Sequence, residues 1–254
     1  MSLLAGRHAL VTGASRGIGA AIATAFSAQG ASVTLMVRDQ LRARPVADSL
    51  TGPVAIVIAD LTDRAAVHAA CAEAAERLGA VDVLVNNAGF TESAPFLKTG
   101  PEMFERMIAI HLMGAVHTTQ AVLPSMIERG QGHVINVAST AGLRGETYVS
   151  AYVAAKHALV GLTRALALEV SKKGVAVNAV CPGYTDTDLV RDAVARIADR
   201  SRMSEDEVLR TILAGAGQAR LVKPEEVAAA VIALCATPAG APTGQTVVID
   251  GAQS

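Results

Sequence analysis

Three residues in the middle of the chain could together move a proton to or from an oxygen atom. Tyr152 and Lys156 are four residues apart in a helical pattern, Tyr152–Lys172, so the phenol and the ammonium group lie on one helix face. A nearby cation lowers the pKa of a phenol, which would let Tyr152 exchange a proton near neutral pH. Ser139 ends an apolar run and could hydrogen-bond the same carbonyl or alcohol oxygen. A Tyr–Lys pair alone is also typical of surface packing, so its interpretation depends on the rest of the chain.

A glycine-rich turn near the start of the chain predicts a site for a pyrophosphate. The apolar run Leu10–Thr12 leads into Gly13-Ala14-Ser15-Arg16-Gly17-Ile18-Gly19, and a helical pattern begins at Gly17. Glycines allow a sharp turn and close approach of a ligand, and a helix start offers free N–H groups and a positive dipole end. The spacing Gly-x-x-x-Gly-x-Gly differs from the common Gly-x-Gly-x-x-Gly fingerprint. A purely structural turn is the alternative interpretation.

The residues after the second apolar run favour NADP(H) over NAD(H). An acidic residue at this place would hold a ribose 2′-hydroxyl, whereas a basic residue suits a 2′-phosphate. Here Val37 is followed by Arg38, and Arg16 in the glycine turn adds a second guanidinium. The alternative is that Arg38 is solvated and that Asp39 is the ribose ligand.

Two more strand ends carry polar or small residues that suit a ligand. Asp60 could accept a hydrogen bond from an adenine amino group, or could cap a helix together with Thr62. The run 86–89, Asn-Asn-Ala-Gly, suits close passage of a ligand along the strand end, although a plain turn would look similar.

Strand-like apolar runs alternate with alanine-rich amphipathic stretches of helical length, which predicts an α/β fold with a parallel sheet covered on both faces. The expected strands are His8–Thr12, Ser32–Val37, Val54–Ala59, Val81–Asn86, His133–Ala138, Ala176–Val180 and Thr246–Ile249. No linker or repeat interrupts them, so we expect one domain over residues 1–254. Residues 187–223 read as two short helices, the second with a capping box from Ser204 to Glu207. Their place between the last two strands predicts a substrate lid or, equally, a surface insertion.

The composition narrows the class of protein. The chain has 254 residues, of which 51% are apolar, and its net charge is -1. This charge does not indicate the excess of basic residues that nucleic-acid binding requires. The three cysteines, Cys71, Cys181 and Cys235, are far apart, which argues against a disulfide framework or a zinc site. Residues 1–5 are too short for a signal h-region, and no apolar run is long enough to span a bilayer. We expect a soluble cytoplasmic protein without a metal.

Taken together, the motifs resemble the short-chain dehydrogenase/reductase family over essentially the whole chain. The matching positions are Thr12-Gly13-x-x-x-Gly17-x-Gly19, Asp60, Asn86-Asn87-Ala88-Gly89, Ser139, Tyr152-x-x-x-Lys156, Asn178 and Pro182-Gly183 leading to Thr187. The resemblance implies a doubly wound Rossmann fold with seven parallel strands. It also implies that Tyr152 is the general acid/base, that Ser139 orients the carbonyl, and that Lys156 lowers the pKa of the tyrosine and holds the nicotinamide ribose.

The resemblance further implies a cofactor site and an assembly. Asn87 and Gly89 would line the cofactor, and Thr187 would contact the carboxamide. The full implied set is Gly13, Ser15, Arg16, Gly17, Ile18, Gly19, Arg38, Asp60, Leu61, Asn87, Ala88, Gly89, Tyr152, Lys156, Pro182, Gly183, Thr185 and Thr187. The family usually forms tetramers through its two longest helices, here Met103–Arg129 and Tyr152–Lys172, and through the last strand.

One position departs from the family pattern. The family usually has an Asn in the helix before strand five, where it holds a water that links the lysine to solvent, and here that position is His111. His111 could join the proton relay and add a group that titrates near neutrality. It could instead be a tolerated substitution with slower proton delivery, or mark altered or lost activity. The other histidines, His8, His68, His117, His133 and His157, read as packing or surface residues.

The substrate is indicated less directly. The chain is most similar to the family's 3-oxoacyl-[acyl-carrier-protein] reductases, which implies reduction of a 3-oxoacyl thioester with NADPH. Small residues after the fifth strand, Ala141 and Gly142 with Leu143, leave room above a cofactor. The lid supplies apolar residues that suit an acyl chain or core packing, Leu189, Val190, Val194, Ile197, Leu209 and Leu213. Basic residues that match the family's docking places for an acidic acyl carrier protein are Arg129, Lys172 and Lys173.

Two other functions stay open at this stage. One is an NAD(P)-dependent dehydrogenase of a secondary alcohol, either cyclic, steroid-like or aromatic, or a hydroxyacyl-CoA. The other is a nucleotide-binding scaffold or sensor with little turnover, which the intact Ser139, Tyr152 and Lys156 argue against and His111 keeps open.

Overall fold

A parallel sheet forms the centre of the computed structural model, which describes residues 3–236 and 242–251. In this part of the chain seven strands are paired in the order β3-β2-β1-β4-β5-β6-β7, and every pair is parallel. The strands are β1 His8–Thr12, β2 Ser32–Val37, β3 Val54–Ile58, β4 Val83–Asn86, β5 Gly132–Val137, β6 Val175–Pro182 and β7 Thr246–Ile249. The predicted bounds of β1, β2 and β7 are confirmed, and the others shift by one or two residues. Residues 1–2, 237–241 and 252–254 of the expected domain lie outside the described residues.

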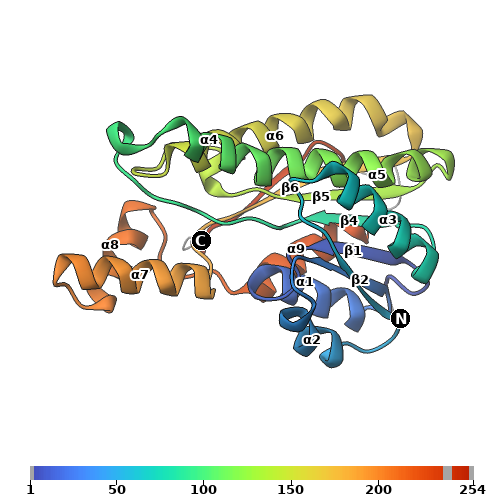
Figure 1. Cartoon of the computed structure of the whole chain (residues 1–254), viewed down its shortest axis with the longest axis horizontal. Coiled ribbons are helices and arrows are strands. Elements are labelled where there is room, and N and C mark those ends of the chain that lie inside the picture. The colour runs from blue at the N-terminus through green and yellow to red at the C-terminus, as the bar shows by residue number, and fades with distance from the viewer. Residues whose placement is uncertain (1–2, 237–241, 252–254) are drawn as a thin grey trace.

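Helices cover both faces of the sheet (Figure 1). One face carries α1 Gly17–Ala28, α2 Gln40–Ser49 and α9 Pro224–Cys235. The other carries α3 Arg64–Leu78, α4 Pro101–Ile108, α5 Gly114–Glu128 and α6 Ser150–Val170. Strands β1, β5 and β6 are buried along their whole length, as continuous apolar runs between two helix layers must be. The predicted doubly wound α/β fold is confirmed.

The long helix expected over Met103–Arg129 is interrupted by a π-helical turn. α4 ends at Ile108, the turn η2 covers Ala109–Met113, and α5 continues from Gly114. A π turn inserts one extra residue into a helix and so changes which side chains face inward. Here it contains His111, which is buried with 4% of its surface exposed.

The end of the second long helix also differs from the prediction. α6 begins two residues before Tyr152 and ends at Val170, followed by the 3₁₀ helix η4 Ser171–Lys173 and by Gly174 in the left-handed region. Two further 3₁₀ helices, η1 Phe96–Lys98 and η3 Thr140–Gly142, lie in the connections after β4 and β5.

A chain of buried polar side chains ties the sheet to two helices. The Asn86 amide donates to Asn136 Oδ1 at 2.9 Å, and the Asn136 amide donates to Thr163 Oγ1 on α6 at 2.8 Å. Thr118 on α5 donates to Asn86 Oδ1 at 2.6 Å. Each of these groups would carry a desolvation cost of about 1–3 kcal/mol without its partner, so the bonds fix how α5 and α6 lie on β4 and β5.

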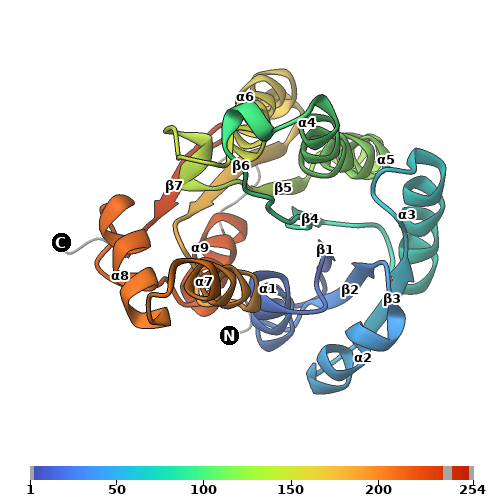
Figure 2. The same cartoon turned by 60° about the vertical axis from the view of Figure 1, so that its left-hand side comes forward.

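Residues 187–223 form the two helices that the sequence predicts, α7 Asp188–Ser201 and α8 Glu205–Gly215. The predicted capping box is confirmed, since Ser204 Oγ accepts from Glu207 N and Glu207 Oε2 accepts from Ser204 N at 2.8 Å. Figure 1 shows both helices (orange) set apart from the two helix layers, and Figure 2 shows them at the near end when that side comes forward. A parallel bridge between Thr185 and Val222 brings the two ends of this excursion together.

Two other expectations concern classes of site. Across the described residues, no helix combines the length and apolar character that crossing a membrane would need. Cys71, Cys181 and Cys235 are buried free thiols, and the described residues contain no group of side chains suited to holding a metal ion.

The buried imidazole of His133 makes stability sensitive to acid. Neither ring nitrogen has a hydrogen-bond partner, and burial, aided by Arg7, lowers the pKa to about 4 from the ordinary 6.5. The unfolded chain therefore binds more protons between these values, and the stabilisation present above pH 6.5 is lost as pH falls towards 4. His133→Leu should leave stability at pH 7.5 equal or higher and reduce this loss, as urea denaturation across that range would show. His157→Leu, on the exposed side of α6, is the control, and an unchanged pH slope in His133→Leu would contradict the explanation.

Candidate active site

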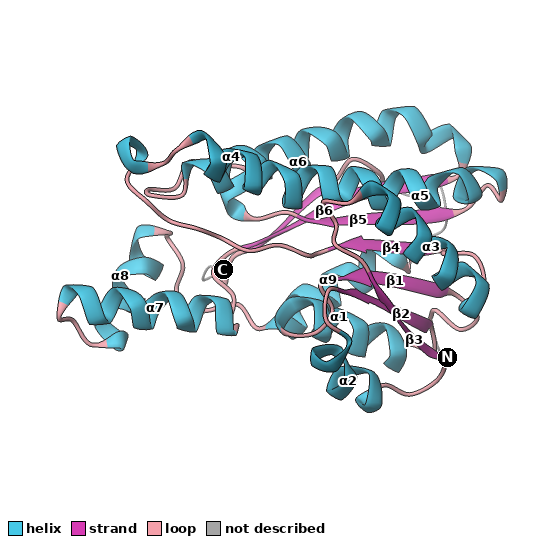
Figure 3. Ribbon diagram, in the orientation of Figure 1, coloured by secondary structure: helices cyan, strands magenta, loops and turns pink. Residues whose placement is uncertain are grey.

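The carboxyl ends of the strands form the edge at which the predicted site residues gather. Figure 3 shows these ends facing α7 and α8. Strands β1 and β4 are neighbours there, and the chain order reverses between them, with β2 and β3 on one side and β5 to β7 on the other. Such a switch point leaves a crevice in which ligands bind in doubly wound sheets.

The glycine turn after β1 is packed so closely that larger residues would not fit. A Cβ on Gly13 would lie 2.8 Å from Ala88 Cα, and one on Gly19 would lie 2.5 Å from Asn87 Nδ2. Gly13 and Gly17 also have positive φ angles, of 66° and 56°. Unlike α2, α3 and α8, helix α1 begins with no side chain capping its N–H groups. The turn with Ser15, Arg16 and Ile18 therefore fits a pyrophosphate, which would accept from these N–H groups.

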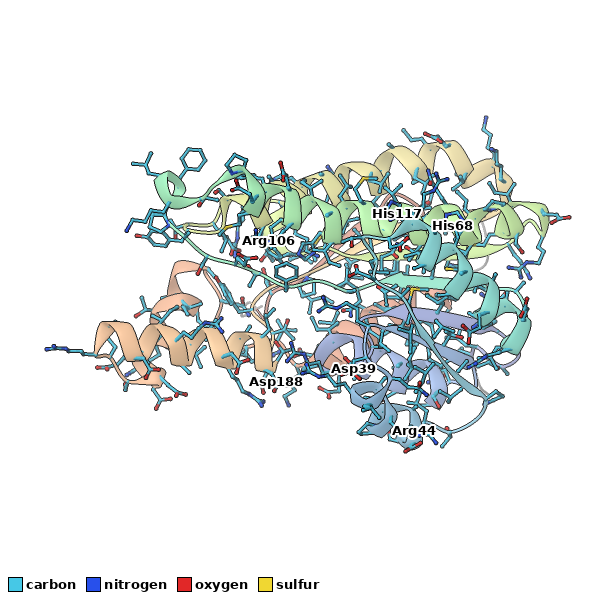
Figure 4. The ribbon with its side chains drawn as sticks, in the orientation of Figure 1. Asp39, Arg44, His68, Arg106, His117 and Asp188 are labelled. Atoms are coloured by element: carbon cyan, nitrogen blue, oxygen red, sulfur yellow. The ribbon has the colours of Figure 1, made fainter. Side chains whose placement is uncertain are left out.

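The structure separates the two candidate ribose ligands after β2. Asp39 is the N-cap of α2, and its Oδ1 accepts from Leu41 N at 2.9 Å. Its other oxygen lies 3.4 Å from Arg42 Nε. Figure 4 labels Asp39 at this helix start. The carboxylate is therefore occupied by local contacts, whereas the Arg38 side chain is exposed and close enough to Asp60 for its charge to lower the pKa of that carboxyl.

Asp60 and Leu61, at the end of β3, form a turn rather than a helix cap. Asp60 Oδ1 accepts from both the backbone N–H and the hydroxyl of Thr62, at 2.9 and 2.7 Å, and these bonds are the main reason that the Asp60 pKa is lowered. The cap of α3 is Asp63 instead. Leu61 is buried, and its carbonyl accepts from His117 on α5, a residue labelled in Figure 4.

The segment after β4 is held against the glycine turn. The Thr12 hydroxyl accepts from the backbone N–H of Asn87 and of Ala88, at 2.9 and 3.0 Å, and the Asn87 amide donates to the Thr12 carbonyl at 2.9 Å. Next to it, the His111 ring occupies the space where a Cβ on Gly89 would lie, with Nδ1 only 2.6 Å from that position. The His111 ring therefore leaves no room for a side chain at position 89.

Ser139, Tyr152 and Lys156 meet at the ends of β5 and α6. Lys156 Nζ donates to the Val137 carbonyl at 2.8 Å and lies 5.6 Å from the centre of the Tyr152 ring. Ser139 is the N-cap of η3, where its Oγ accepts from Ala141 N at 3.1 Å, and its side chain also hydrogen-bonds the Tyr152 phenol. The structure thus brings together the three residues that the sequence singles out.

The ionisation of this group differs from the sequence expectation. Burial raises the pKa of Tyr152 to about 12, and the opposing effect of the Ser139 hydroxyl is smaller. Burial likewise lowers the pKa of Lys156 to about 8. The expectation of a lowered phenol pKa is therefore wrong for this structure, because burial is the largest effect and Lys156 is not among the groups that shift the Tyr152 pKa. The phenol is protonated at neutral pH.

His111 is a neutral imidazole with a fixed tautomer. Its Nε2 donates to the Phe90 carbonyl at 2.7 Å, so Nδ1 carries the lone pair, and this buried atom has no partner. Its ring meets the Tyr152 ring edge-on at 5.2 Å between centres. Burial, and then the charge of Lys156, lower the His111 pKa to about 3, so the expected ionisation near neutrality is wrong. His111 and Lys156 both line a cavity of about 10 Å³, close to the space that one water needs.

The segment after β6 returns to the glycine turn. Thr187 Cγ2 lies 3.2 Å from the position of a Cβ on Gly17, and the Thr187 hydroxyl donates to the Thr185 carbonyl at 3.3 Å. Pro182 is the last residue of β6, and Gly183 N donates to Ile249 O at 2.8 Å. Asn178 lies away from this group, since its side chain bonds Pro242 and Gln245. It joins β6 to the last strand.

The basic residues proposed for docking a carrier protein lie at the opposite edge. Arg129 ends α5 just before β5 begins, and Lys172 and Lys173 precede β6. The Arg129 guanidinium pairs with Asp82 at 2.5 Å and donates to the Val81 carbonyl, so it already has partners. Within one chain these residues do not border the site.

Two residues near the phenol were missed by the sequence interpretation. Glu146 precedes α6, and Tyr184 follows β6. The Tyr184 hydroxyl donates to Glu146 Oε2 at 3.4 Å, and beside the larger effect of burial the Glu146 carboxylate and the Tyr184 phenol also raise the pKa of Tyr152. No spacing or motif in the sequence pairs them, because they are 38 residues apart.

The chain is similar to known proteins over almost its whole length. A family model described as short chain dehydrogenase matches residues 7–198. D-beta-hydroxybutyrate dehydrogenase of Rhizobium meliloti (strain 1021) is 36% identical over 251 residues, covering 96% of this chain and 97% of its own. Acetoacetyl-CoA reductase of the same organism is 37% identical, covering 97% and 98%. The crystal structure of L-sorbose reductase from Gluconobacter frateurii, complexed with NADPH and L-sorbose, superposes with a TM-score of 0.92 at 28% identity, covering 99% and 98%.

The contact between Gly89 and His111 gives a testable coupling. Gly89→Ala should lower the free energy of unfolding by about 1–3 kcal/mol, because the new Cβ would overlap the imidazole ring. In a His111→Ala background the same change should cost much less, since the ring is gone. Gly145→Ala, at a position with no atom within 4 Å of its Cβ, is the control. Urea unfolding measures all four variants, and additive effects at residues 89 and 111 would contradict the coupling.

Proposed function

The chain belongs to the short-chain dehydrogenase family, and we propose that it uses NADPH to reduce the ketone of a 3-oxoacyl thioester to an alcohol. Family membership and the named relatives make it an NAD(P)-dependent oxidoreductase that acts on a ketone or alcohol. One observation carries the catalytic proposal: Ser139, Tyr152 and Lys156 meet at the carboxyl edge of the sheet.

The residues around the glycine turn support NADP(H) as the cofactor. The uncapped start of α1 and the close-packed glycines fit a pyrophosphate. Asp39 is occupied as a helix cap, which leaves Arg38, with Arg16, to meet a 2′-phosphate. Asp60, Leu61, Asn87, Ala88 and Gly89 would line the adenosine and ribose, and Pro182, Gly183, Thr185 and Thr187 the nicotinamide end. When bound, the cofactor supplies the hydride.

In the proposed reaction the protein moves the proton. Ser139 holds the carbonyl oxygen, and Tyr152 donates its proton to that oxygen as the alcohol forms. A phenol with a pKa of about 12 is protonated at neutral pH, which suits the direction of reduction. Lys156 Nζ lies 5.6 Å from the centre of the Tyr152 ring, where it would hold the nicotinamide ribose next to the reacting groups.

We assign His111 a positioning role beside Lys156. The neutral Nδ1 needs a hydrogen-bond donor, and the cavity that it shares with Lys156 is the size of one water. A water there would accept from the ammonium group and donate to Nδ1, which provides a path for the next proton. Of the three interpretations of His111 given by the sequence, this is the hydrogen-bonding relay, but His111 does not titrate near neutral pH because its pKa is about 3.

The substrate class rests on the acetoacetyl-CoA reductase relative and on the lid. We propose that residues 187–223 cover the substrate, with Leu189 and Ile197 partly exposed on α7 to meet an acyl chain. Val194 and Leu213 are instead buried where α7 packs on α8. The second candidate function, oxidation of a secondary alcohol, is favoured by the hydroxybutyrate dehydrogenase relative.

The acyl group would be carried on CoA or on an acyl carrier protein. We do not expect Arg129 to dock an acidic carrier, because its guanidinium is paired with Asp82. A homotetramer in the cytoplasm remains a prediction. The apolar Leu168 on α6 and Val248 on the edge strand β7, 84% and 47% exposed, suit such contacts, and sedimentation as a monomer would contradict them.

The first test follows nicotinamide absorbance with acetoacetyl-CoA as the ketone. We expect NADPH to be oxidised rapidly and NADH slowly, because only NADPH offers a 2′-phosphate to Arg16 and Arg38. Tyr152→Phe should lower kcat by about 10²–10⁴-fold without weakening NADPH binding. Binding of NADPH without turnover of this ketone would contradict the thioester proposal, and turnover by Tyr152→Phe at the wild-type rate would contradict its role as the acid.

The second test concerns His111. His111→Leu removes the acceptor that faces the cavity and should lower kcat about tenfold or more, whereas His111→Asn keeps a polar group and should retain most of the rate. The pH profile above pH 5 should keep its shape in both variants, because the His111 pKa is about 3. Loss of a titration near neutral pH in His111→Asn would show that this assignment is wrong.

A further inference from the structure

A carboxylate stands beside the proposed catalytic phenol. Glu146 comes from the connection between β5 and α6, and Tyr184 from the connection after β6. Both side chains are half-buried, and the Tyr184 hydroxyl donates to Glu146 Oε2 at 3.4 Å. Both connections follow the carboxyl ends of neighbouring strands, at the edge where Ser139 also lies, and both side chains influence the ionisation of Tyr152. The pair therefore borders the place where the reacting oxygen would lie.

Among the described residues Glu146 has no ion-pair partner, and the nearest cation, by its effect on Tyr184, is Arg144. Arg144, two residues earlier, instead donates to the Ala216 carbonyl at the end of α8, at 2.6 Å. A carboxylate at this place makes the Tyr152 phenolate harder to form, so it does not assist proton transfer.

The backbone of Tyr184 is held firmly, so its hydroxyl has a defined place. The buried Gln218 side chain accepts from Tyr184 N and donates to Tyr184 O, both at 2.8 Å. Val222 N also donates to the Tyr184 carbonyl at 2.9 Å. These bonds fix the segment after β6 to the end of the lid excursion, and the Tyr184 side chain carries the hydroxyl to Glu146.

We propose that Glu146 and Tyr184 form a substrate subsite that accepts a hydrogen-bond donor from an uncharged ketone and excludes a ketone that carries a free carboxylate. The inference rests on the proposed function, because it takes Tyr152 as the group that meets the ketone oxygen. One Glu146 oxygen remains available to an amide N–H of a thioester arm or to the hydroxyl of a hydroxyketone. A carboxylate at the same place would meet an unpaired like charge, which disfavours binding.

The test compares acetoacetate with its uncharged ethyl ester. With NADPH, the wild-type protein should reduce the ester with a kcat/KM at least about tenfold higher than that for acetoacetate. Glu146→Gln keeps the shape and removes the charge, so it should raise kcat/KM for acetoacetate relative to the ester by about tenfold. Glu169→Gln, an equal change of charge on an exposed position of α6, is the matched control and should leave the ratio unchanged.

A second readout does not depend on turnover. Glu146→Gln should lower the pH at which the buried phenols ionise, measured by the ultraviolet absorbance of phenolate, while Glu169→Gln should not. If both ketones are reduced but their ratio is the same in Glu146→Gln as in the wild type, the subsite is wrong and the proposed function stands. If neither the ester nor acetoacetyl-CoA is reduced, the proposed function is wrong. The subsite is then judged by the phenolate titration, and an unchanged titration in Glu146→Gln overturns it.

Discussion

The hydrogen bond between Asn86 and Asn136 is the contact on which the arrangement of the site depends. It joins β4 to β5 inside the sheet, and Thr118 and Thr163 extend it to α5 and α6. These four elements and the turn η2, together with Ser139 shortly after β5, carry the groups of the proposed proton path. Because a buried amide without partners costs about 1–3 kcal/mol, the helices cannot slide along the sheet without a penalty. The apolar core alone would tolerate such shifts more easily, since hydrophobic contacts have no fixed direction.

Much of the fold could be predicted because its signals are local or periodic. The bounds of β1 and β2 follow from continuous apolar runs that two helix layers must cover. The capping box at Ser204 is a contact within four residues, so the spacing of its two partners determines it. The glycine turn is predictable for a similar reason, because the positive φ of Gly13 and Gly17 is a property of single residues. The gathering of Ser139, Tyr152 and Lys156 then follows from a parallel sheet, in which all carboxyl ends share an edge.

What the sequence could not reveal depends on contacts between distant residues or on burial. Asn136 and Thr163 look like ordinary residues of a strand and a helix until the fold brings them together. The π turn around His111 arises from packing within a helix whose sequence pattern is continuous. The ionisation of Tyr152 was misjudged because the spacing to Lys156 shows a nearby cation but not the burial of the phenol, and burial is the largest effect on its pKa. Asp39 was the alternative ribose ligand in the sequence, and only its contact with Leu41 N shows that it caps α2, a role that the sequence interpretation had not considered.

The bridge between Thr185 and Val222 also has a consequence for how such a chain can change. The excursion that carries α7 and α8 leaves and re-enters the fold at one place, where Asp186 N donates to Val222 O at 2.8 Å. When the two ends of an insertion are already bonded to each other, a change in its length changes the entropy of loop closure only slightly. The length of the excursion between its two ends is therefore uncoupled from the geometry of its base, where Thr185 and Val222 are held next to the sheet.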